Sequence, residues 1–216
     1  MEINEDLAEF IGAFVGDGCL SEYNRSDRKK GTIKEIVFTG AWEKDYQYYK
    51  KIIQPILIKN FNISGTIKQR EDDNSLRFRI FRRPIFSFLL EIGFKFGPKS
   101  DNVEIPEMIL NNNQLHRAFI RGLFNTDGTI YKRYSKKYTR HNRLYSNYKV
   151  IQFKAVSQKL IEQVHDLLLN LNLNPNKIIK TDNAWVCRIT SQKEVNKFGR
   201  EIITNHLYHL KRFLEK

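Results

Sequence analysis

Two patterns of apolar and polar residues alternate along this chain, and they recur in the same order in its two halves. Runs with a period of two are typical of strands with one buried face, whereas apolar residues three or four positions apart are typical of amphipathic helices. In the first half they predict strands near 18–25, 33–39, 63–70 and 75–82, and helices from Glu43 to Phe61 and from Arg83. In the second half they predict strands at 128–135, 147–155, 177–181 and 184–190, and helices over Ser157–Leu171 and from Gln192.

One short motif opens each half. FIGAFVGDG (10–18) and IRGLFNTDG (120–128) both place apolar residues at helical spacing, carry glycine at the third position and end in Asp-Gly. The two final glycines are expected to adopt the backbone dihedrals that end a helix. Further along, IVFTGAWEKDYQYY and IQFKAVSQKLIEQV align without gaps and pair Phe38 with Phe153. The chain is therefore predicted to be an α+β protein of two pseudo-symmetric α-β-β-α-β-β-α halves, each with an antiparallel four-stranded sheet.

The connection between the halves lies in FGPKSDNVEIPEMILNNN (96–113), which holds prolines, polar turn residues and a run of asparagines. These residues favour a turn-rich connector over a further helix or strand of the repeat. We divide the chain into an N-terminal half at 1–105, a linker at 106–113 and a C-terminal half at 114–216.

Basic residues are in large excess. The 37 Lys and Arg against 24 Asp and Glu give a net charge of +13, which favours a polyanionic partner. Residues 1–105 hold 17 basic and 16 acidic side chains (net +1) and residues 106–216 hold 20 and 8 (net +12), so the second half is expected to supply more of the non-specific affinity. An anionic membrane would suit the same charge, but no stretch approaches the roughly 20 apolar residues that span a bilayer. The acidic N-terminus is unlike a secretion signal, so we expect an intracellular protein of the cytoplasm, nucleoid or organelle matrix, not secreted and not bound to membranes.

Other kinds of site have little support in the sequence. Cys19 and Cys187 are far apart and predict two free thiols. His206 and His209 have no further ligand at metal-binding spacing and are assigned to a helix face. There is no phosphate-binding GxxxxGK[ST] loop and no nucleophile elbow. Aromatic residues at helical spacing are assigned to the core: Tyr46, Tyr48 and Tyr49.

The two motifs end in a pair of carboxylates. Small residues recur four positions apart in both motifs, at Gly12, Gly16, Gly122 and Thr126. Helices that pack closely through such residues would bring Asp17 and Asp127, which are 127 − 17 = 110 positions apart, to the same end of their interface. A single Asp-Gly is more often an ordinary helix stop. The matched pair favours a shared site instead, because adjacent carboxylates need cations between them and oxygen donors suit Mg²⁺.

With these motifs at the head of two such halves, the chain resembles the monomeric, two-motif LAGLIDADG homing endonucleases over nearly its whole length. The resemblance implies a DNA-binding saddle and cleavage of one phosphodiester on each strand of a long asymmetric target, leaving staggered ends. It implies that Asp17, Asp127 and the backbone carbonyls of Gly16 and Thr126 hold Mg²⁺, with Mn²⁺ as a substitute and Ca²⁺ supporting binding alone. Because the chain lacks the Cys or Ser start and His-Asn finish of an intein, we expect a free-standing, intron-encoded monomer.

Basic residues near the aspartates are candidates for charge neutralisation during catalysis. Lys99, in GPKS, and Lys154, at the end of a predicted strand, are assigned this catalytic role, although a phosphate contact or a solvated charge explains each of them equally well. The sequence departs from some family members at Gly40 and Ala155, where Gln or Asn is common. The polar residues that complete the catalytic site are therefore left open.

The strands after each motif are predicted to read DNA. Arginines alternate with apolar residues in LRFRI (76–80), which places basic side chains on one face that suits the major groove. The family's pattern adds alternate residues after each Asp-Gly, and the basic hairpin connections at 24–30 and 132–143 suit the DNA backbone, unless they are only solvated loops. The predicted DNA-binding residues are Ser21, Tyr23, Arg25, Arg28, Lys30, Lys34, Lys68, Arg70, Arg77, Arg79, Tyr131, Arg133, Ser135, Lys137, Arg140, Gln152, Lys180 and Arg188.

The leading hypothesis is a Mg²⁺-dependent, site-specific endonuclease acting on double-stranded DNA. Two binding functions compete with it: an intron maturase that uses the basic surface on RNA, and a catalytically silent DNA-binding regulator. Retention of both aspartates favours cleavage over the silent regulator, because pure binding gains nothing from two carboxylates near phosphate.

Overall fold

The computed structural model describes residues 2–24, 32–70, 72–97, 101–133 and 148–215. The first half consists of α1 (Glu5–Asp17), β1 (Gly18–Asn24), β2 (Thr32–Ala41), α2 (Trp42–Tyr48), the π-helical turn η1 (Tyr49–Ile53), α3 (Gln54–Phe61), β3 (Thr66–Gln69), β4 (Ser75–Ile80) and α4 (Arg83–Glu91). The second half follows the short helix α5 (Glu107–Leu110) and the 3₁₀ turn η2 (Asn113–Leu115). It consists of α6 (His116–Thr126), β5 (Gly128–Arg133), β6 (Tyr148–Ala155), α7 (Gln158–Asn170), β7 (Ile179–Thr181), β8 (Ala184–Ile189), α8 (Gln192–Glu201) and α9 (Leu207–Leu214).

The two sheets have the same strand order. The first is β1-β2-β4-β3 and the second is β5-β6-β8-β7, with every neighbouring pair antiparallel. The register also repeats, because Gly18 pairs with Phe38 and Gly128 pairs with Phe153. The predicted α+β class and its two four-stranded antiparallel sheets are therefore confirmed.

Local sequence signals explain where the helices begin. The side chain of Asn4 accepts a hydrogen bond from the backbone N–H of Leu7, and acidic residues in the first turn of α1 complement the helix dipole. Ser157 caps α7 through the backbone N–H of Leu160. Prolines occupy the first turns of α3 and α4, where no backbone donor is lost.

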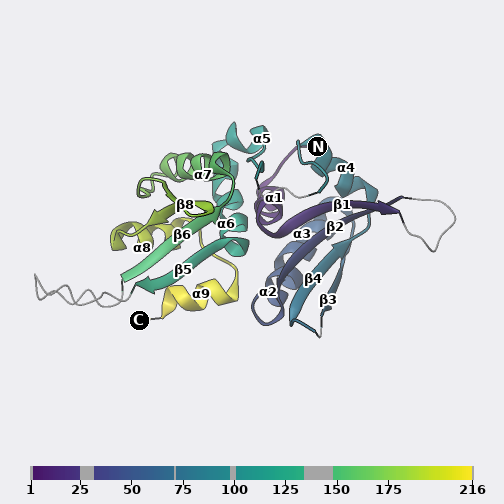
Figure 1. The fold of residues 1–216 in the computed structure, drawn as a ribbon, viewed down its shortest axis with the longest axis horizontal. Coiled ribbons are helices and arrows are strands. Elements are labelled where there is room, and N and C mark those ends of the chain that lie inside the picture. Colours follow the sequence, from purple (N-terminus) through teal and green to yellow (C-terminus); the bar gives the residue numbers. More distant parts are fainter. Residues whose placement is uncertain (1, 25–31, 71, 98–100, 134–147, 216) are drawn as a thin grey trace, which may run out of the picture.

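The helices α1 and α6 lie side by side at the centre of the molecule, with one sheet on either side (Figure 1). A Cβ atom built at Gly12 would lie 2.1 Å from the carbonyl oxygen of Phe119, and one built at Gly122 would lie 2.0 Å from that of Glu9. Neither position can hold a side chain without moving a backbone. The two glycines therefore set the distance between the halves.

The glycines that follow the motif aspartates have a different role from the one expected. Gly18 has φ −78° and ψ 149°, and Gly128 likewise lacks a positive φ. Their Cβ atoms would lie 2.2 and 2.3 Å from ring carbons of Phe14 and Phe124. Glycine is required here because each strand begins against an aromatic ring, and the predicted helix-ending dihedrals are wrong.

A buried polar network joins the halves. Glu9 on α1 is only 3% exposed, and its carboxylate accepts hydrogen bonds from Nε of Arg121 on α6 and from Nδ2 of Asn205, each at 2.8 Å. Asn205 in turn accepts a bond from Asn125 at 2.7 Å. The segment between α8 and α9 therefore contacts both central helices.

The helix α9 was not expected from the repeat, because the first half has no equivalent. It contacts α2 of the first half and β5 of the second, and in Figure 1 it lies below the junction. His206, just before α9, places Nε2 3.1 Å from the Asp45 carboxylate, and His209 packs on Phe124. Both histidines are buried, which corrects the predicted solvated helix face. Within the described ranges, no helix is long and apolar enough to cross a bilayer.

Candidate active site and nucleic-acid interface

The C-terminal ends of the two central helices meet. A Cβ atom built at Gly16 would lie 2.1 Å from Oγ1 of Thr126 and 3.4 Å from the carboxyl carbon of Asp127. Asp17 follows Gly16 directly, so the two motif aspartates lie at the same end of the α1–α6 interface although they are 127 − 17 = 110 positions apart. The first strand of each sheet begins at the next residue.

Asp17 is held by a buried tyrosine. Tyr49 donates a hydrogen bond from Oη to Oδ2 of Asp17 at 2.7 Å, and its ring is completely buried. Burial, followed by the nearby charge of Asp17, holds the pKa of Tyr49 well above its ordinary value of 10.0. The phenol therefore remains a neutral donor to the carboxylate. The sequence indicated only that this residue belongs to the core.

The donors at the motif ends suit a hard divalent cation. They are two carboxylates and the backbone carbonyl groups of Gly16 and Thr126, all of them oxygen ligands of the kind that Mg²⁺ and Ca²⁺ prefer. Across the described part of the chain, no group of three or more His, Cys, Asp or Glu side chains could hold a metal ion. A cation at the motif ends would therefore depend on further oxygen ligands from water or a bound phosphate.

The two predicted catalytic lysines have different standing. Lys154 is exposed on β6, immediately after Phe153, whose strand partner Gly128 follows Asp127. Its position in the register is therefore at the Asp127 end of the sheet. Lys99 lies outside the described residues.

The departure from the family pattern at Gly40 has a local cause. The Asp45 carboxylate accepts a 2.6 Å hydrogen bond from the backbone N–H of Ala41, at the start of α2. A Cβ atom at Gly40 would lie 2.5 Å from that same carboxylate. No Gln or Asn side chain can be accommodated at this position while Asp45 caps the helix.

Comparison with known proteins now becomes decisive. Residues 114–203 match a family model described as a LAGLIDADG-like domain.

The second half is a LAGLIDADG-like domain.

Solved structures extend the likeness to the whole chain. The complex of I-DmoI with DNA and Mn aligns with a TM-score of 0.64 at 20% identity, covering 94% of this chain and 98% of that one. I-AabMI, a LAGLIDADG meganuclease bound to uncleaved DNA, aligns with a TM-score of 0.65 at 13% identity over 97% and 88%. The N-terminal LAGLIDADG domain of DUF199/WhiA gives 0.57 at 14% identity over 97% and 87%. The chain therefore has the two-domain LAGLIDADG fold.

Curated relatives come from Methanocaldococcus jannaschii and are much longer than this chain. A replication factor C small subunit is 30% identical over 131 residues, which are 61% of this chain and 6% of that protein. A glutamine–fructose-6-phosphate aminotransferase is 25% identical over 183 residues, covering 83% of this chain and 14% of that protein. An uncharacterized protein is 25% identical over 214 residues, covering 92% and 21%. The likeness is thus confined to a small part of each relative.

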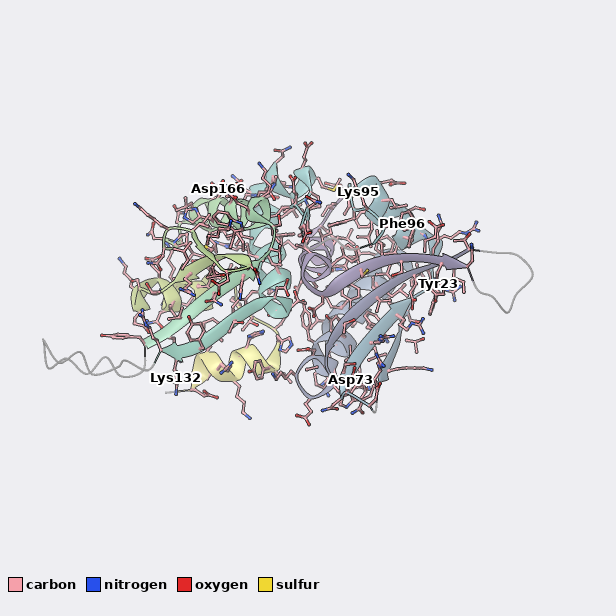
Figure 2. The ribbon with its side chains drawn as sticks, viewed as in Figure 1. Tyr23, Asp73, Lys95, Phe96, Lys132 and Asp166 are labelled. Carbon is pink, nitrogen blue, oxygen red and sulfur yellow. The ribbon has the colours of Figure 1, made fainter. Side chains whose placement is uncertain are left out.

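In the first LAGLIDADG half, most of the predicted groove-facing residues share one face of the sheet. Cross-strand partners lie on the same face, and the register pairs Thr66 with Arg79 and Lys68 with Arg77. Ser21 and Tyr23 lie on this same face, which is opposite to the one buried under the helices. Tyr23 is toward the outer end of β1 (Figure 2).

Two basic residues of this half are placed differently from the prediction. Lys34 lies on the helix-covered face, with Nζ 5.4 Å from the ring centroid of Phe86 and 3.7 Å from the Glu22 carboxylate. Arg70 is paired with acidic residues of its own turn, at 2.7 Å from Asp72 and 3.7 Å from Asp73. Three further predicted contacts lie outside the described residues: Arg25, Arg28 and Lys30.

Glu35 is a residue of this surface that sequence reasoning missed. Its carboxylate is almost completely buried and accepts hydrogen bonds from Oη of Tyr23 at 3.1 Å and from Nε of Arg79. The bond to Glu35 raises the pKa of Arg79 above its ordinary value. The alternation placed Glu35 on this face beside Ser21, but it gave no sign that the carboxylate would orient an arginine and a tyrosine.

The second LAGLIDADG half repeats the arrangement with different residues. Arg188 donates from Nε to Oε1 of Gln152 at 2.7 Å, and Tyr131 and Arg133 lie on the same face of the sheet. Lys180 does not, because it pairs with Trp185 on the opposite face and its Nζ lies 5.4 Å from that ring. The remaining predicted contacts lie outside the described residues: Ser135, Lys137 and Arg140.

Proposed function

We propose that this chain is a site-specific endonuclease that hydrolyses one phosphodiester on each strand of double-stranded DNA with a divalent metal ion. The contact between the motif ends carries the proposal, because it gathers Gly16, Thr126 and Asp127 at one end of the central helices, beside Asp17. The structural neighbours I-DmoI and I-AabMI are described in complex with DNA, which supports the same kind of substrate here.

Two carboxylates near a phosphate backbone serve hydrolysis better than binding. Unless a cation offsets them, negative side chains repel the phosphates and weaken the complex. Metal, when bound, supplies activation of water and neutralises charge on the leaving 3′ oxygen. Asp17 and Asp127 would hold it, one for each strand. Mg²⁺ is the proposed physiological ion, since structures of I-DmoI with Mn, Ca and Mg are known and Mg²⁺ is the most compatible with an all-oxygen site.

Lys154 would act from the Asp127 side of the site. An ammonium group at the start of the sheet lowers the energy of the negative charge that develops on a phosphorane-like transition state. Its exposed position on β6, on the same face as Gln152, supports this role. Lys99 is proposed for the corresponding role from the linker.

The two sheet faces would hold the DNA. Arg77, Arg79 and Arg188 are suited to bidentate contacts with guanine in the major groove, and the ion pair with Glu35 fixes the orientation of Arg79 in advance. Because the two faces carry different residues, the proposed target is long and asymmetric. Both faces belong to one chain, so the proposed active form is a monomer.

The test is a selection from a plasmid library with randomised inserts. The protein is incubated with the library and Mg²⁺, and linear plasmids are recovered and sequenced. The proposal predicts cleavage at one extended sequence, with staggered ends. Sequence-specific retention of circular plasmids without any cutting would establish the silent regulator instead, and selective binding of a structured intron RNA without DNA cleavage would establish the maturase.

A further inference from the structure

The two motif aspartates have unequal surroundings. Asp17 is half-buried and accepts the 2.7 Å hydrogen bond from Tyr49, whereas Asp127 is exposed. The strand register allows the corresponding position in the second half to be identified. Phe38 and Phe153 are equivalent, because each pairs with the glycine after its motif aspartate, and Tyr49 lies 49 − 38 = 11 positions beyond Phe38.

The equivalent of Tyr49 is a residue that cannot donate a hydrogen bond. Eleven positions beyond Phe153 is Val164, which is buried in α7 as Tyr49 is buried in η1. The preceding residues, Tyr48 and Gln163, are buried as well, so the two helices present the same register to the core. The second half therefore has a methyl group where the first half has a hydroxyl group.

The hydroxyl group of Tyr49 has little freedom. Its ring centroid lies 5.5 Å from that of Phe38, 5.8 Å from that of Phe78 and 5.7 Å from that of Tyr48, and no part of the side chain is exposed. A ring packed on three sides fixes the position of its oxygen, and a carboxylate bonded to that oxygen loses rotational freedom. Asp17 is therefore pre-oriented by the core of its own half.

We propose that Tyr49 is a positioning residue that orients the Asp17 carboxylate for cation binding, and that the two half-sites are consequently unequal. This inference rests on the proposed endonuclease function and extends it to the separate strands. Loss of the hydroxyl group would weaken the half-site built on Asp17 and leave the one built on Asp127 nearly unchanged. The strand served by Asp17 would then be cut more slowly.

The experiment compares Tyr49→Phe with Tyr48→Phe, using a selected target whose two strands carry different end labels. Tyr48 is an adjacent buried tyrosine, and its hydroxyl group bonds to Glu9 instead, at 3.4 Å. In Tyr49→Phe we expect one strand to be cut roughly 10- to 100-fold more slowly, as loss of a hydrogen bond to a charged group implies. In Tyr48→Phe we expect the ratio of the two strand rates to match that of the unaltered protein.

A second readout does not depend on cleavage. Calcium is titrated into the protein–DNA complex and followed by calorimetry. Tyr49→Phe should bind Ca²⁺ more weakly than Tyr48→Phe, and thermal unfolding should show that both variants are folded. A purely structural role would lower the stability of both variants and alter neither the strand ratio nor the calcium affinity.

Removing the carboxylate distinguishes positioning from a general loss of structure. In an Asp17→Asn background, adding Tyr49→Phe should leave the remaining nicking of the other strand unchanged, because there is no carboxylate left to orient. Slower nicking of that strand, or equal slowing of both strands in Tyr49→Phe alone, would overturn the inference. If the unaltered protein cuts neither strand of any selected sequence, the proposed function itself fails.

Discussion

Gly12 and Gly122 are spacers between two backbones. Each hydrogen at these positions faces a carbonyl group of the opposite helix, and an added Cβ atom would have to displace that helix. The contact lies at the middle of the α1–α6 interface, and the motif aspartates lie at one end of it. A small change at a glycine therefore affects both stability and the geometry of the candidate site.

We predict that Gly122→Ala lowers the free energy of unfolding by about 3 kcal/mol, at the upper end of the cost of overpacking, because the contact is with backbone. Urea denaturation measures the change. Gly199→Ala is the matched control, since its Cβ atom would meet only the Phe213 ring at an ordinary 3.4 Å. A helical glycine of that kind should become more stable by up to about 1 kcal/mol. Equal destabilisation of the two variants would contradict the role of Gly122 as a spacer.

Residue-level patterns in the sequence identify faces but not distant partners. Alternation correctly placed Arg77 and Arg79 together on one side of the sheet. It gave no sign that Glu35 would bond to Arg79, or that the hydroxyl group of Tyr49 would reach Asp17, because both contacts depend on how elements far apart in sequence are packed. The Asp-Gly ends show the same limit, since their glycines are explained by neighbouring aromatic rings.

The helix α9 shows how a single element can join the two halves. Asn205, just before it, bonds to Glu9 of the first half, and the preceding Thr204 bonds to Asn125 of the second at 2.6 Å. The repeat predicted the other helices and strands because each was supported twice by the pattern. It could not predict α9, which follows residue 203, where the match to the LAGLIDADG-like domain ends.

Burial of His209 makes this element sensitive to acid. Burial, together with the nearby His206, lowers the pKa of His209 from its ordinary value of 6.5 to about 3. The unfolded chain therefore binds the proton first as the pH falls. The stability linked to neutral His209 is complete above about pH 6.5 and declines by about 1.4 kcal/mol for each pH unit below it, until the pH reaches about 3.

We predict that His209→Phe flattens the dependence of unfolding free energy on pH between about 5 and 6.5, since the titrating group is replaced by a ring of similar shape beside Phe124. Urea denaturation across this interval measures the slope. The same exchange at His165, which lies on α7 away from α9, should keep the slope that His209 causes. An unchanged slope in His209→Phe would show that another group controls the acid response.

At the scale of the whole molecule, the sheets extend away from a shared centre. In Figure 2, Tyr23 lies toward the outer end of β1 and Lys132 toward the outer end of β5, on opposite sides of α1 and α6. The motif ends lie where both sheets begin. A duplex held along both sheets would therefore place its middle over the aspartates, which is the arrangement that cutting both strands requires.

We predict that Arg79→Ala weakens binding to a selected target by about 1–3 kcal/mol and relaxes the preference at one base pair, because a bidentate base contact is lost. Lys34→Ala removes the same charge from the helix-covered face of the same sheet and should change affinity far less. Fluorescence anisotropy in Ca²⁺ at constant salt measures both variants, and circular dichroism verifies their folding. Equal losses would mean that total charge, rather than the face of the sheet, governs binding.

The most direct test of the account is the behaviour of Asp17→Asn and Asp127→Asn on a selected target. Each variant is assayed for binding in Ca²⁺ and for cleavage in Mg²⁺, beside the unaltered protein. We predict that both variants retain sequence-specific binding and that neither makes a double-strand break at an appreciable rate, because each strand requires its own carboxylate. Undiminished double-strand cleavage by either variant would contradict the assignment of the paired aspartates as the catalytic centre.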